Sequence, residues 1–105
     1  MTTFDKREEG FERKFALDEE LKFKAEARRN RLLGLWVAEQ LDIKGDAASA
    51  YAKQIVAAAF DGTDHVARRV TADLAAKGIT LSEPELRTKM EELTALAVMQ
   101  VKTGN

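Results

Sequence analysis

Hydrophobic and polar positions along most of this chain recur with the period of an α-helix. Gly45, Gly62 and Gly78 separate stretches rich in good helix formers, chiefly Ala, Leu, Glu, Lys and Arg. The pattern predicts an all-α protein with helices over about 5–41, 46–60, 64–77 and 83–102. The short connections between them indicate a compact four-helix bundle in which sequence neighbours pack together.

Local signals predict how the last three helices begin. Asp46 and Thr63 stand where N-caps of the second and third helices are expected. Ser82 and Glu85 have the spacing of a capping box at the start of the fourth helix. The apolar faces predicted for these three helices are Ala48, Tyr51, Ala52, Ile55, Val56 and Ala59; Val66, Val70 and Leu74; and Leu86, Met90, Leu93, Ala97 and Val101.

The first helix carries two apolar stripes that do not line up. On a wheel of about 100° per residue, Phe4, Phe11 and Phe15 lie near 20–60°. The second stripe, near 260–360°, consists of Leu17, Leu21, Ala25, Leu32, Leu35 and Trp36. Because one rigid helix cannot lay both stripes on the same core, we expect two parts. Residues 1–18 form a mobile N-terminal segment, and residues 19–105 form the bundle.

Composition excludes several kinds of site. The chain has no Cys and one His, which rules out disulfides, thiolate nucleophiles, Cys-ligated metals and multi-His metal sites. That histidine, His65, lies away from the buried stripe of its helix and is expected to be exposed. No glycine-rich phosphate loop occurs. We therefore expect a protein that is not an enzyme and holds no metal or cofactor.

Targeting signals are also missing from the pattern. The first fifteen residues lack the apolar core of a signal peptide. The longest apolar run, residues 32–38, is far shorter than the ~20 residues of a membrane span. The expectation is a soluble, cytoplasmic protein without direct membrane insertion.

The densest basic patch lies on the first helix and consists of Lys24, Arg28, Arg29 and Arg31. Glu26 interrupts the patch, and Phe23 is the only nearby aromatic residue. The whole chain has 17 Lys and Arg against 18 Asp and Glu, a net charge of −1. These features argue against a nucleic-acid partner and are consistent with contact to an acidic protein surface.

The aromatic stripe near the N-terminus is the strongest functional signal. Phe4, Phe11 and Phe15 are spaced by seven and four residues, which places them on one helix face. The basic residues that flank them are Lys6, Arg7, Arg13 and Lys14. This arrangement is typical of a helix that inserts into a groove of a partner protein. The alternative is a helix end that folds back onto the bundle.

One run of the sequence is distinctive: residues 23–36 read FKAEARRNRLLGLW. Together with Phe4-Asp5-Lys6-Arg7-Glu8, Phe11-Glu12, Lys14-Phe15-Ala16 and Asp18-Glu19-Glu20, it resembles the ζ-subunit family of α-proteobacterial F1FO-ATP synthases. The resemblance covers essentially the whole chain and is strongest over residues 4–36. Two positions depart from the family's pattern, Gly10 in place of Ala and Leu17 in place of His.

The resemblance implies an inhibitor of the F1 motor with a four-helix fold. Its N-terminal helix would insert at an α/β/γ catalytic interface of F1 and block rotation and ATP hydrolysis, so that the partners are the F1 α, β and γ subunits. The side chains that would face F1 are Phe4, Lys6, Arg7, Phe11, Lys14 and Phe15. The protein would then lie at the cytoplasmic face of the inner membrane, through F1.

A second hypothesis stays open at this point. The bundle surface could bind an adenine nucleotide weakly and act as a sensor, with Arg28, Arg29 or Arg68 as ligand contacts. Arg28 and Arg29 would alternatively serve as anchor contacts to F1.

Overall fold

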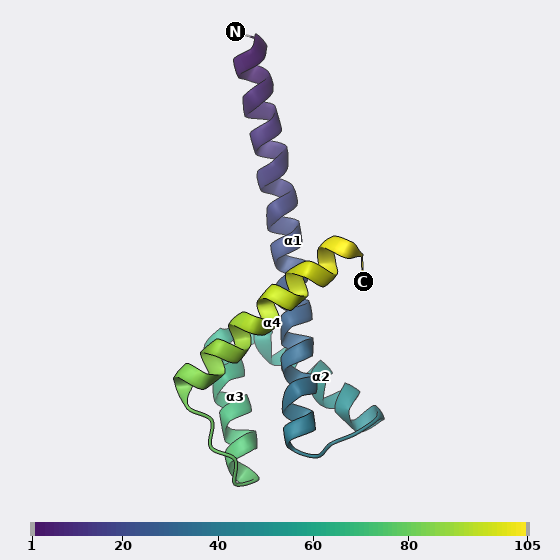
Figure 1. Cartoon of the computed structure of the whole chain (residues 1–105), viewed down its shortest axis with the longest axis vertical. Coiled ribbons are helices and arrows are strands. Elements are labelled where there is room, and N and C mark those ends of the chain that lie inside the picture. Colours follow the sequence, from purple (N-terminus) through teal and green to yellow (C-terminus); the bar gives the residue numbers. More distant parts are fainter. Residues whose placement is uncertain (1, 105) are drawn as a thin grey trace.

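The computed structural model of this chain consists of helices joined by short connections within its described backbone (Figure 1). The structure describes the backbone of residues 2–104 and the side chains of residues 19–104. Within this range lie four α-helices and one short 3-10 helix: α1 (Thr2–Gln40), α2 (Asp46–Ala58), η1 (Ala59–Asp61), α3 (Thr63–Ala76) and α4 (Glu83–Thr103). The prediction of an all-α protein with four helices is confirmed.

The predicted N-cap residues of α2 and α3 are each wrong by one position. Gly45 and Gly62 occupy the N-cap positions, and neither has a side chain that could accept a capping hydrogen bond. Asp46 and Thr63 are instead the first helical residues. Gly62 has a φ of 112°, a conformation that costs little only without a Cβ atom, so the turn into α3 requires glycine there.

The capping box at the start of α4 is confirmed. The backbone N–H of Glu85 donates to Ser82 Oγ at 3.2 Å, and the backbone N–H of Ser82 donates to Glu85 Oε1 at 3.3 Å. The hydrogen bonds from Ser82 lower the pKa of Glu85. The carboxylate is therefore the form that supports this helix end, and its contribution is lost as the pH falls through that lowered pKa.

Helix α1 is the central element, with α2 on one side and α4 crossing it on the other (Figure 1). Helix α3 contributes the fully buried Val66, Val70 and Leu74 to the core. The expectation that sequence neighbours pack together therefore holds for α1 and α2 but not for α4, which packs against α1. The buried hydrophobic cluster consists of Leu33, Val37, Ala38, Tyr51, Ile55, Ala58, Val66, Val70, Leu74 and Leu86.

The predicted buried stripe of α1 is only partly correct. Leu33 and Val37 are fully buried, although neither belongs to the predicted stripe, whereas Trp36 is only half-buried. Leu33 lies near 60° on the same wheel, the position of Phe15. Because α2 and α4 flank α1, the helix buries more than one side. The phase difference alone therefore does not separate residues 1–18 from the bundle.

Gly34 allows α1 and α2 to approach each other closely. A Cβ atom at this position would lie 2.6 Å from the backbone Cα of Ala52 and 3.3 Å from Ile55 Cβ. The first of these distances is well inside van der Waals contact. Ala52 and Ile55 are themselves fully buried, so the surroundings have no free space into which they could move. Glycine is therefore a packing requirement of the α1–α2 interface.

Candidate functional site

The candidate partner-binding residues lie outside the described side chains. These residues are Phe4, Lys6, Arg7, Phe11, Lys14 and Phe15. Their assignment stays a prediction from the sequence, as does the boundary between residues 18 and 19. The described structure bears on the other candidates, which lie on the bundle.

Arg28 and Arg29 are adjacent in sequence but face different surroundings. The half-buried Arg28 points towards the C-terminal end of α4, where its Nη1 donates to Gln100 Oε1 at 3.3 Å. Arg29 Nε donates to Oδ1 of the buried Asn30 at 3.2 Å. Arg29 also lines a small hollow between α1 and η1. The structure therefore does not bring the two guanidinium groups to one site.

Arg68 lies on helix α3. It lines an open groove of about 580 Å³ between α3 and the start of α4, and its Nε donates to the backbone oxygen of Asp64 at 3.5 Å. Asp64 and Glu83 also line this groove. Arg29 also lines a hollow that adjoins this groove and shares Asp64 and Glu83 with it, whereas Arg28 lines a separate hollow. Two carboxylates beside Arg68 would oppose a phosphate group there.

The other charged candidates are solvated surface groups. Lys24 forms an ion pair with Glu20 one turn earlier, at 3.2 Å, with both side chains more than half exposed. Arg31 and His65 are exposed, the latter as predicted.

No group of three or more His, Cys, Asp or Glu within residues 19–104 is arranged to hold a metal ion. In the same part of the chain, no helix has both the length and the apolar character needed to cross a bilayer.

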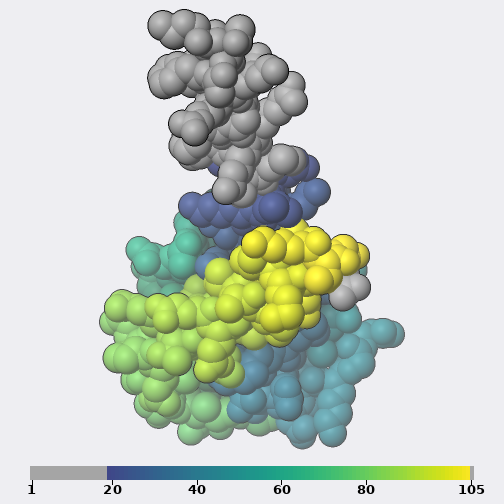
Figure 2. Space-filling view, turned by 45° about the horizontal axis from the view of Figure 1, so that its top comes forward, coloured from purple at the N-terminus to yellow at the C-terminus, as the bar shows by residue number. Residues whose placement is uncertain are grey.

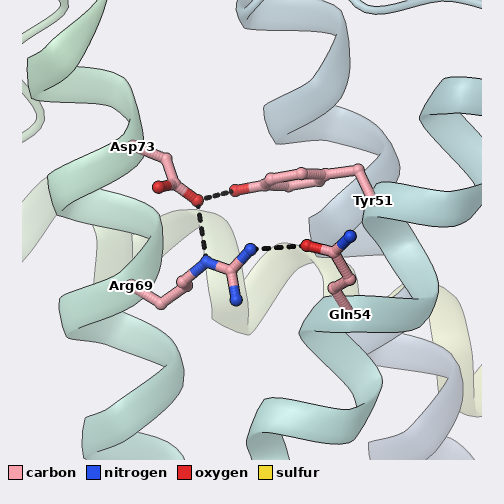
Figure 3. Close-up of polar contacts among 4 residues, drawn as sticks. All are labelled: Tyr51, Gln54, Arg69 and Asp73. Carbon is pink, nitrogen blue, oxygen red and sulfur yellow. Dashed lines mark hydrogen bonds and ion pairs between the residues drawn. The ribbon is translucent and has the colours of Figure 1, made fainter.

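A polar network that the sequence did not predict joins α2 to α3 (Figure 3). Tyr51 Oη donates to Asp73 Oδ2 at 2.6 Å, and Arg69 Nε donates to the same oxygen at 3.1 Å. Arg69 Nη2 also donates to Gln54 Oε1 at 2.6 Å. The i, i+4 spacing of Arg69 and Asp73 was the only available signal, because the contact with Tyr51 depends on how α2 and α3 pack. The network adds polar contacts between α2 and α3 to the packing of Val66, Val70 and Leu74 in the core.

The Tyr51 hydroxyl gives a pH-dependent prediction. Burial, and then the hydrogen bond to Asp73, raises the pKa of Tyr51 above its ordinary value. The protonated hydroxyl therefore stabilises the fold below about pH 10, and this contribution is lost as the pH rises further. Tyr51→Phe should lower the free energy of unfolding by about 1–2 kcal/mol at pH 7. Chemical unfolding at pH 7 and pH 11 should show this difference shrinking, and an equal difference at both would contradict the role of the hydroxyl.

Comparisons with known proteins agree with the helical fold. The family model for ATPase inhibitor subunit zeta matches residues 1–100. A protein structure solved by solution NMR is similar to this one, with a TM-score of 0.70 and 47% sequence identity. The similarity covers 81% of this chain and 99% of that chain. No curated protein sequence matches the chain.

Proposed function

This chain belongs to the ATPase inhibitor subunit zeta family, and we propose that it inhibits F1 by inserting residues 1–18 as a helix. The insertion site is an α/β/γ catalytic interface, where the helix blocks rotation and ATP hydrolysis. Family membership indicates a regulator of an ATPase, and that the chain is not itself an enzyme belongs to the proposal. Its partner is accordingly the F1 complex, and the choice of the α, β and γ subunits belongs to the proposal.

The observation that carries this proposal is the combination of the family match with the N-terminal pattern. The match begins at residue 1 and so includes the whole inserted segment. Within it, Phe4, Phe11 and Phe15 supply large apolar anchors on one helix face. The flanking Lys6, Arg7 and Lys14 suit an acidic rim around a groove, where charge complementarity speeds association.

The bundle contributes a firm attachment for this segment. Helix α1 extends from Thr2 to Gln40, so the segment and the bundle belong to one helix. The C-terminal half of α1 is fixed by the fully buried Leu33, Val37 and Ala38. A force on the inserted segment is therefore transmitted to a packed domain. This arrangement supports a role for residues 19–105 as an anchor outside the catalytic interface, at the cytoplasmic face of the membrane.

A double substitution tests whether the aromatic residues act on F1 or in the bundle. Phe11→Ala with Phe15→Ala should weaken inhibition of the cognate F1 by about a hundredfold or more, because buried aromatic anchors dominate such interfaces. The unfolding temperature of the free protein should change little. A loss of about 3–5 kcal/mol in its stability would instead assign the rings to the core and contradict the proposal.

A further inference from the structure

Two of the largest exposed apolar side chains lie beside one hollow. Phe23 on α1 is 70% exposed and Phe60 in η1 is 85% exposed. Both line a hollow of about 150 Å³ between α1 and η1. We call the apolar residues of this hollow the Phe23–Phe60 patch: Phe23, Ala27, Val56, Ala59 and Phe60. Single exposed apolar residues are common on protein surfaces and need no explanation. Two exposed aromatic rings beside the same hollow form a patch, and exposed apolar patches mark interaction sites.

The patch arises where α1 continues beyond the end of α2. Phe23, Ala27 and Gly34 lie within about 140–180° on the helical wheel of α1. At Gly34 this line is covered by α2, in contact with Ala52. Helix α2 ends at Ala58, and η1 then turns the chain towards α3. The apolar seam between α1 and α2 therefore stays open at the end of the bundle nearest residue 18.

Phe23 also borders a second hollow, on the side of α4. That hollow, of about 440 Å³, is lined by Phe23, Ala27, Arg28 and Val101 among others. In Figure 2, the first described turns of α1 (purple to blue) emerge between the region around η1 (teal) and the end of α4 (yellow). The Phe23 ring thus stands on a ridge between two depressions at this end of the bundle.

The size of the patch indicates what kind of partner it suits. A phenylalanine side chain buries roughly 150–250 Å², so the two exposed rings offer about 300 Å². A stable independent interface buries about 800 Å² on each partner. The patch is therefore too small to hold a second copy of the chain by itself. It is large enough to add to an interface that another part of the chain already makes.

The inserted segment provides that other part. Phe23 follows residue 18 by five positions on the same helix, an axial distance of about 7.5 Å. When residues 1–18 enter F1, the patch is brought to the surface around the opening. Its binding is then intramolecular, so a weak contact contributes strongly.

We propose that the Phe23–Phe60 patch is a second docking surface for the outside of F1, beside the opening through which residues 1–18 insert. This inference rests on the proposed function. The surface it meets presents an apolar side chain that fits the hollow between Phe23 and Phe60. The charged residues of the hollow, Glu26 and Arg29, have opposite signs, so the contact is apolar rather than electrostatic.

The test compares inhibition of the cognate F1 by the full chain and by a Phe23→Ser, Phe60→Ser variant. The concentration for half-inhibition should rise at least about tenfold in the variant, since two exposed anchors are lost. That ratio should not change between low and high salt, because no charge is altered. The unfolding temperature should stay the same. The matched control is Met99→Ser, which removes a side chain that is 61% exposed and lines neither hollow.

The outcomes separate the two proposals. If the full chain inhibits F1 and the double variant inhibits equally well, the docking surface is wrong and the insertion mechanism stands. If sedimentation shows that the double substitution converts a dimer into a monomer without weakening inhibition, the patch joins two copies and the proposal is overturned. If the full chain does not inhibit F1, the proposed function fails and this inference fails with it.

Discussion

Removal of residues 1–18 is expected to abolish inhibition of the cognate F1 and to leave the bundle folded. Among the residues whose side chains the structure describes, the buried cluster lies on residues 33–86, all of which the truncated chain keeps. ATPase assays of F1 should show full activity with residues 19–105 at concentrations far above those at which the full chain inhibits. Thermal unfolding followed by circular dichroism should give a cooperative transition close to that of the full chain.

The truncated chain also separates insertion from docking. The exposed patch around Phe23 is retained in residues 19–105 but is too small to hold F1 without the linked segment. Inhibition by residues 19–105 would therefore contradict the assignment of the inhibitory segment. A large loss of cooperativity would show that residues 1–18 belong to the folded core.

The second large effect is expected from Gly34→Ala. Helix propensity alone predicts that this change stabilises α1 by about 1 kcal/mol. The added Cβ atom would lie 2.6 Å from the Ala52 backbone, which forces α1 and α2 apart. Overpacking of this kind costs about 1–3 kcal/mol, and the separation also disturbs Leu33 and Ile55 in the core. Chemical denaturation should therefore show a net loss of stability.

A substitution in the same helix gives the matched control. Gly10→Ala adds the same methyl group to α1 within residues 1–18, the predicted N-terminal segment. It should not lower the free energy of unfolding of the bundle. An increase in stability with Gly34→Ala would contradict the close approach of α1 and α2.

Much of the fold could be predicted from local sequence signals. The capping box of Ser82 and Glu85 identified the start of α4, and the spacing of Val66, Val70 and Leu74 identified the buried face of α3. These features depend on residues close in sequence. The N-caps were wrongly assigned to Asp46 and Thr63 because the glycine before each was interpreted as part of the connecting turn. Only the backbone geometry shows that Gly45 and Gly62 are themselves the N-cap residues.

Features that depend on which helices meet could not be predicted. The pattern of α1 was interpreted as one core stripe, whereas α2 and α4 cover different sides of it, so Leu33 and Val37 were missed. The hydrogen bond between Tyr51 and Asp73 was missed for the same reason, because it depends on how α2 packs against α3. Phe60 is exposed because α2 ends before it and η1 turns the chain towards α3. The periodicity of residues 46–60 did not indicate this exposure.

The candidate site residues also differ in how far the sequence could predict their surroundings. Arg28 and Arg29 are neighbours in sequence, but a helix turns by about 100° at each residue, so they reach different hollows. The inhibitory residues from Phe4 to Phe15 could be proposed from spacing and resemblance because a binding helix carries its pattern within itself. What this helix contacts is determined by the partner, and the sequence of one chain does not contain that information.

The function proposed for this protein is inhibition of F1 through insertion of its N-terminal segment. The most direct test is steady-state ATP hydrolysis by the cognate F1, titrated with the full chain. Hydrolysis is expected to fall with increasing protein and to saturate at low activity. A hydrolysis rate that stays constant throughout the titration would contradict the proposed function.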